Sequence, residues 1–168
     1  FTGSLRGGRA LFDIAAARPT PIPVYAEMGS VNPQFVFPGM LDADPKAFAD
    51  GLFASVTMGN GQFCTCPSLV FVPEGESLNT MIGHYHELVS GSSGAPLLNA
   101  GIAACFESGI DRWQDIEGVE IIARGALEAV EVGAAPVMAK ISLKDFKASR
   151  EMFMEEIFGP SVLVVVCP

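Results

Sequence analysis

Short apolar runs of strand length alternate with amphipathic stretches along this chain, and that alternation limits the folds it can adopt. Helical spacing of apolar residues is clear in three stretches, which begin near Asp44, Leu78 and Ile102. Strands separated by helices are typical of an α/β domain with a largely parallel sheet flanked by helices. Strands are expected at residues 24–26, 35–37, 69–72, 119–123, 136–141 and 161–167.

Length and charge exclude several classes of protein. The chain has 168 residues, which is enough for one sizeable core. Its longest apolar run, residues 162–167, is far shorter than the roughly 18 residues that a membrane helix needs. The net charge of −9, with scattered Lys and Arg, disfavours nucleic acid and anionic membranes as partners. We expect a cytoplasmic protein with no leader peptide.

The four cysteines are expected to be reduced thiols, since their spacing forms no disulfide framework. Cys64 and Cys66 could begin a metal site, but structural zinc normally needs two ligand pairs with wider spacing. His84 and His86 are two residues apart on a predicted helix and point in different directions, so they cannot chelate one ion together. They are expected to be solvated surface residues, and no metal is expected.

The strongest candidate for a catalytic residue is Cys64, in the run Gly61-Gln62-Phe63-Cys64. A single cysteine has two interpretations: a small buried side chain, or a nucleophile whose thiolate must be stabilised. Glu27 lies 37 positions earlier (64 − 27) and Glu156 lies 92 positions later (156 − 64). The chain opens with Phe1-Thr2-Gly3-Ser4, which reads as a turn from a strand into a helix.

The order and spacing of these four motifs, which span the whole chain, resemble the aldehyde dehydrogenase superfamily. The resemblance implies that Cys64 attacks the aldehyde carbonyl and forms a thioester, with hydride passing to NADP or NAD. It implies that Glu27 activates the hydrolytic water, although Ser30 and Val31 depart from the family's Glu-Leu-Gly-Gly-Lys pattern. A base of this kind is expected to be partly buried. Cys66 is expected to line the pocket.

The resemblance also assigns cofactor contacts. Glu156 of the Glu-x-Phe-Gly-Pro motif is expected to bind the ribose hydroxyls, and Phe158 to pack near the nicotinamide. The same residues could instead form a helical C-terminal turn stopped by glycine and proline, and Glu155 is an alternative by a one-residue slip. Gly3 and Ser4 are expected at the pyrophosphate, where a helix N-terminus favours an anion.

The family pattern further predicts the organisation and the substrate. Residues 1–26 are expected to be the end of a cofactor-binding domain, with a remnant of its Rossmann-like fold, and residues 27–168 a catalytic domain truncated at its C-terminus. Residues 18–33 resemble the branch that contains 2-oxoglutarate semialdehyde and fatty aldehyde dehydrogenases. We therefore expect oxidation of a small aldehyde, 2-oxoglutarate semialdehyde, in a homo-oligomeric enzyme. The alternatives are a long-chain aldehyde dehydrogenase and a catalytically silent fragment.

Overall fold

The chain divides into two compact units, Phe1–Ser30 and Val31–Pro168, in a computed structural model that describes residues 1–128 and 130–168. The smaller unit contains helix α1 (Leu5–Ala16) and two short parallel strands, β1 (Thr2–Gly3) and β2 (Glu27–Met28). Ser4 begins α1, because its hydroxyl oxygen accepts a hydrogen bond from the Gly7 N–H. Gly8 packs against β2, since a Cβ there would lie 2.2 Å from the Met28 sulfur.

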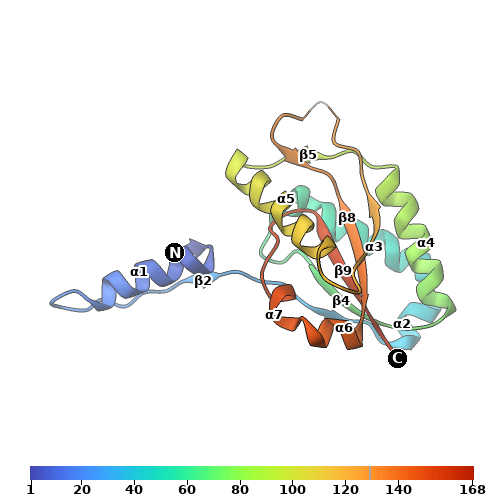
Figure 1. The fold of residues 1–168 in the computed structure, drawn as a ribbon, viewed down its shortest axis with the longest axis horizontal. Helices are drawn as coiled ribbons and strands as arrows, with labels where there is room; N and C mark the ends of the chain where they lie inside the picture. The colour runs from blue at the N-terminus through green and yellow to red at the C-terminus, as the bar shows by residue number, and fades with distance from the viewer. Residues whose placement is uncertain (129) are drawn as a thin grey trace. The chain divides into compact units, whose positions relative to one another are not determined.

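Five strands form the sheet of the larger unit, in the order β3-β4-β9-β8-β6 (Figure 1). The first four run parallel, and β6 is an antiparallel edge strand. The predicted α/β class with a largely parallel sheet is therefore confirmed. The strands are β3 (Gln34–Phe35), β4 (Leu69–Pro73), β6 (Glu120–Arg124), β8 (Val137–Ser142) and β9 (Ser161–Cys167).

Helices cover both faces of this sheet (Figure 1). On one face lie α2 (Pro38–Ala43), α3 (Pro45–Thr57) and α4 (Glu76–Ser90). On the other lie α5 (Ala100–Gln114), α6 (Leu143–Ala148) and α7 (Arg150–Phe153). A two-stranded antiparallel ladder outside the main sheet is formed by β5 (Ala95–Pro96) and β7 (Gly133–Ala134) and is called the β5–β7 ladder.

Strand β9 is apolar from Val162 to Cys167 because both of its faces are buried. Val162 and Val164 pack with the helices of one face, whereas Leu163 and Val165 pack with those of the other. Alternating side chains of a strand point to opposite sides of a sheet, so a central strand in an α/β fold needs apolar residues at every position.

The predicted helices are confirmed where capping and periodicity agree. Asp44 caps α3 through a 2.9 Å hydrogen bond from the Ala47 N–H, with proline at the first helical position. Helix α4 buries the predicted apolar face, including Met81 and Tyr85.

His84 is only partly solvated, since its Nε2 lies 2.8 Å from an Asp50 carboxylate oxygen. No helix among the described residues is long and apolar enough to cross a membrane.

Two predicted strands differ from the structure. No strand covers residues 24–26; pairing with β1 begins only at Glu27. The strand expected at residues 35–37 ends at Phe35, because Phe37 is already the N-cap of α2 and Pro38 its first residue. Strong β-propensity of an aromatic residue is overridden here by the helix start that proline favours.

Candidate active site

Three segments that precede neighbouring parallel strands meet at the amino edge of the larger sheet. Strands β4, β9 and β8 are adjacent and parallel, so the residues leading into them lie at the same edge. Before β4 come residues 59–65, called the thiol loop; before β9 come residues 154–160, called the Glu156 segment. Before β8 comes the β5–β7 ladder. Cys64 and Glu156 are thus brought to one edge of the fold.

The thiol loop turns sharply where α3 ends. The short helix η1 (Met58–Gly61) follows α3 directly, and Gly59, Asn60 and Gly61 have φ of 54°, 53° and 70°. These values lie in the left-handed region, which glycine adopts at little cost. The turn leaves Cys64 exposed at the end of the loop.

The thiol loop and the Glu156 segment are in backbone contact. A Cβ placed on Gly61 would lie 2.3 Å from the carbonyl carbon of Gly159 and 2.5 Å from the Pro160 nitrogen. Only glycine permits two backbones to approach this closely. The Gly-Gln-x-Cys and Glu-x-Phe-Gly-Pro motifs, 92 positions apart (156 − 64) in the chain, are therefore neighbours in the fold.

Side-chain amides anchor the loop to its surroundings. The Gln62 Oε1 atom accepts a 2.8 Å hydrogen bond from the Leu98 N–H, and its Nε2 donates to the Gly59 carbonyl at 3.2 Å. The Asn32 Nδ2 donates to the Thr65 carbonyl at 2.6 Å. Gln62 belongs to the motif around Cys64, and Asn32 lies in residues 18–33, which the sequence also singled out. The residues around Leu98 carried no recognisable signal.

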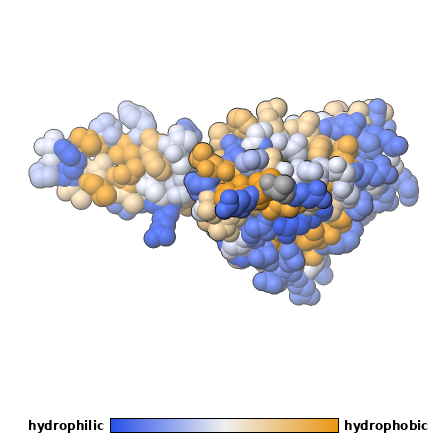
Figure 2. All heavy atoms as spheres, turned by 90° about the horizontal axis from the view of Figure 1, so that it is seen from above, coloured by the Kyte–Doolittle hydropathy of each residue, from blue (hydrophilic) through white to orange (hydrophobic). Residues whose placement is uncertain are grey.

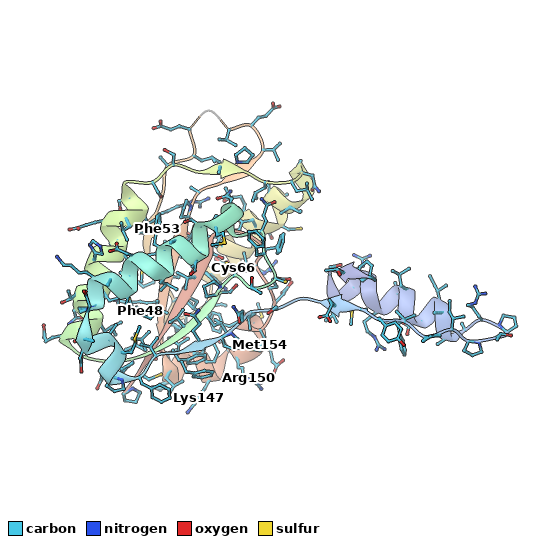
Figure 3. All side chains as sticks on the ribbon, turned by 180° about the vertical axis from the view of Figure 1, so that it is seen from behind. Phe48, Phe53, Cys66, Lys147, Arg150 and Met154 are labelled. Atoms are coloured by element: carbon cyan, nitrogen blue, oxygen red, sulfur yellow. The ribbon has the colours of Figure 1, made fainter. Side chains whose placement is uncertain are left out.

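The two neighbouring thiols differ in environment. Cys64 is exposed, and no backbone oxygen within residues 1–128 and 130–168 accepts a hydrogen bond from its N–H. Cys66 is buried near the end of α3 (Figure 3), with its sulfur 3.8 Å from the Val56 carbonyl oxygen. Burial, and secondarily the negative charge of Glu156, raise the pKa of the Cys66 thiol to about 11. Cys66 is therefore a buried neutral thiol rather than the pocket-lining group that we expected.

The Glu156 segment follows the last helix instead of ending it. Helix α7 stops at Phe153, and Gly159-Pro160 leads into β9, so the interpretation as a helical C-terminal turn is wrong. Glu156 and Phe158 are half-buried, and the negative charge of Glu156 contributes to the raised pKa of the Cys66 thiol. Its neighbour Glu155 is exposed and lies 3.5 Å from the Arg112 guanidinium.

Within the smaller unit, Glu27 is exposed on β2, and its N–H donates to the Phe1 carbonyl at 2.9 Å. The partial burial expected for a general base is not found within this unit. Gly3 and Ser4 lie at the N-terminus of α1, as predicted. The first turn of that helix has no acidic residue and includes Arg6, which suits an anion such as a pyrophosphate.

The carboxyl edge of the larger sheet carries none of these motif residues. An open cavity of about 680 Å³ lies there, lined by Glu74, Gly75, Ser142 and Val166 among others. In open α/β sheets ligands usually bind at the carboxyl edge, so this candidate site departs from the common arrangement.

Among the described residues, no group of three or more His, Cys, Asp or Glu side chains could hold a metal ion.

Comparison with known proteins identifies the family. The model of the aldehyde dehydrogenase family matches residues 1–168, so the chain belongs to that family. It is 38% identical over 99% of its length to alpha-ketoglutaric semialdehyde dehydrogenase 2 of Azospirillum brasilense. It is 34% identical over 98% of its length to alpha-ketoglutaric semialdehyde dehydrogenase of Acinetobacter baylyi. The chain spans about a third of these relatives, 32% and 31% of their lengths.

Solved structures show the same fold. Proline utilization A of Bradyrhizobium japonicum superposes with a TM-score of 0.79 at 24% identity, covering 100% of this chain and 17% of that one. A candidate aldehyde dehydrogenase of Burkholderia cenocepacia superposes with a TM-score of 0.77 at 26% identity, covering 99% of this chain and 35% of that one. The fold of the chain is thus that of an aldehyde dehydrogenase segment.

Proposed function

We propose that this chain is the catalytic segment of a longer homo-oligomeric enzyme that oxidises 2-oxoglutarate semialdehyde, using NADP or NAD. The observation that carries the proposal is the backbone contact between Gly61 and Gly159, because it joins the thiol motif to the Glu156 motif. The two alpha-ketoglutaric semialdehyde dehydrogenases at 38% and 34% identity support this substrate. The assignment of residues 1–26 to a cofactor-binding domain and 27–168 to a catalytic domain is part of the proposal.

In this mechanism the Cys64 thiolate forms a bond to the aldehyde carbonyl carbon, and the carbonyl oxygen becomes an oxyanion. The Cys64 N–H, which has no backbone acceptor in the described part of the chain, is available to donate to that oxyanion. The oxyanion then re-forms a carbonyl as the carbon–hydrogen bond breaks, which leaves a thioester on Cys64, and the nicotinamide of a bound cofactor would accept the hydride. Glu27 then takes a proton from water, whose oxygen attacks the thioester and releases the carboxylate and the Cys64 thiolate.

The cofactor contacts are assigned to residues whose chemistry fits them. The half-buried carboxylate of Glu156 offers acceptors for ribose hydroxyls, and the half-buried ring of Phe158 offers an apolar surface for the nicotinamide. Gly3 and Ser4 precede the helix N-terminus assigned to the pyrophosphate. Ser4 already accepts a hydrogen bond from the Gly7 N–H at 3.2 Å, so the N–H groups nearer the start of α1 are the ones left for an anion.

Thiol reactivity tests the identity of the nucleophile. In the full-length enzyme at pH 8, limiting iodoacetamide should label Cys64 first, ahead of Cys105, which is also exposed but lies outside both motifs. Cys66 should react least, because a thiol with a pKa of about 11 is almost entirely protonated at that pH. Its labelling should rise only as the pH approaches 11. Peptide mapping measures the labelling of all four cysteines at once. Equal rates at Cys64 and Cys105 would contradict the assignment of Cys64 as the nucleophile.

Glu27 is tested by separating the two half-reactions. Glu27→Gln should slow thioester hydrolysis by about 100- to 10,000-fold, the range of general base catalysis, while leaving thioester formation nearly intact. A stoichiometric burst of NAD(P)H should therefore survive while steady-state turnover collapses. Rapid mixing with absorbance at the reduced nicotinamide band measures both phases. Loss of the burst together with turnover would instead indicate that Glu27 activates the thiol or supports the fold.

A long-chain aldehyde is the second candidate substrate, because large apolar side chains are exposed on and beside the thiol loop. Phe63 is 48% exposed and Leu98, whose N–H binds Gln62, is 80% exposed. Figure 2 views the molecule from the side of the β5–β7 ladder and shows apolar side chains gathered beside it. Saturation kinetics of the full-length enzyme with both aldehydes would decide, since the physiological substrate has the higher kcat/KM.

The third candidate is a folded module without turnover. The chain covers 32% of its Azospirillum relative, and much of a dinucleotide-binding domain would lie outside such a segment. An NAD(P)H absorbance assay on residues 1–168 alone separates the module from the enzyme. Light scattering on the same sample would show whether the exposed apolar side chains of α1, such as Phe12 and Ile14, cause self-association.

A further inference from the structure

Asn60 occupies a tightly constrained position in the thiol loop. It lies four residues before Cys64 (64 − 60), has φ of 53° and is only 8% exposed. A left-handed conformation costs an ordinary residue about 1–2 kcal/mol, and asparagine adopts it more readily than most. A buried amide must also have hydrogen-bond partners, or it destabilises the fold. The position therefore selects both a backbone conformation and a polar side chain.

The Asn60 side chain donates to both strands of the β5–β7 ladder. Its Nδ2 lies 2.7 Å from the Ala95 carbonyl oxygen and 3.2 Å from the Ala134 carbonyl oxygen. Ala95 and Ala134 are opposite each other in the ladder, so one NH₂ group bridges a paired position. Two carbonyl acceptors use both donors of the amide, and they identify the bridging atom as nitrogen.

The loop is thus held on two sides. Gly61 packs on the backbone of Gly159 and Pro160, and Asn60 fixes the loop to the β5–β7 ladder. Gln62 adds a contact to the chain just beyond β5, where it accepts from the Leu98 N–H. Each contact restrains residues immediately before Cys64, and a thiol must be placed to within about an ångström to react efficiently.

We propose that Asn60 is a positioning residue that sets the orientation of Cys64 by tying the thiol loop to the β5–β7 ladder. The proposal rests on the proposed function, in which Cys64 is the nucleophile. Asn60 touches no reacting atom; it acts through the loop backbone. A shift of the ladder relative to the sheet would move the thiol, so this contact couples the ladder to the reaction.

Two substitutions in the full-length enzyme separate an effect on the position of Cys64 from an effect on the stability of the fold. Asn60→Gly keeps the left-handed backbone but removes both hydrogen bonds, so kcat should fall about 10- to 100-fold while the KM for the cofactor stays unchanged. Asn60→Asp keeps the shape but turns an oxygen toward two carbonyls. A protonated aspartic acid can donate one hydrogen bond. The alkylation rate of Cys64 in this variant, relative to wild type at each pH, should therefore recover as pH falls.

Asn79→Gly is the matched control. Asn79 is exposed on α4, and replacing asparagine with glycine there costs only about 0.3 kcal/mol of helix stability. It should leave kcat unchanged. A wild-type kcat in Asn60→Gly, or a Cys64 alkylation profile in Asn60→Asp that does not respond to pH, would overturn the positioning role. Failure of the proposed function itself is recognised separately, because Cys64→Ala would then retain turnover.

Discussion

Replacing Cys64 with alanine in the full-length enzyme is expected to reduce kcat by about 10⁴- to 10⁶-fold, the range seen when a covalent nucleophile is removed. Cys64 is exposed, so the substitution leaves no cavity and the melting temperature should change little. Cofactor affinity should also remain. Steady-state kinetics measure kcat, which should fall, and a cofactor binding titration measures the affinity, which should stay the same.

Two other cysteines serve as controls for this substitution. Cys105→Ala changes an exposed thiol on α5 and should leave kcat unchanged. Cys66→Ala removes a buried sulfur and should lower stability by about 1 kcal/mol, because a small cavity is created under the loop. If Cys66→Ala abolished turnover while Cys64→Ala preserved it, the nucleophile would be the second thiol of the pair.

Much of the larger unit follows from local signals in its sequence. Asp44 and Pro45 predict the start of α3 because capping and the fixed φ of proline act within one turn. The apolar run of β9 predicts a strand buried on both faces. The motif around Cys64 predicts a sharp turn after α3, since two glycines permit left-handed backbone there.

The geometry of the candidate site could not be predicted because it depends on contacts between distant segments. Asn60 looks like an ordinary loop residue, and only the register of β5 with β7 places two carbonyls at its amide. Cys66 is two positions from an exposed thiol yet is buried, because the loop turns inward under α3. Its raised pKa has no local signal, since both the burial and the charge of Glu156 come from tertiary structure.

Introducing alanine at Gly61 is expected to disable the site through the backbone rather than through a catalytic group. The new Cβ would lie 2.3 Å from the Gly159 carbonyl carbon and oxygen, and φ at this position is 70°. Backbone atoms cannot rotate away as a side chain can, so the loop must move. The strain of a left-handed alanine and the overpacking should together cost about 2–4 kcal/mol of stability. A displacement of about 1 Å at the thiol should lower kcat about 100-fold.

Gly51→Ala is the matched control, because it introduces the same methyl group on the helix that leads into the loop. Nothing lies within 4 Å of a Cβ at Gly51, and its φ is not in the left-handed region. Alanine is the better helix former by about 0.5–1 kcal/mol, so this variant should be slightly more stable and fully active. Urea unfolding and steady-state kinetics on both variants measure the contrast. Equal stability and activity of the two would mean that the thiol loop does not pack on Gly159 as the geometry indicates, and the observation that carries the proposed function would be lost.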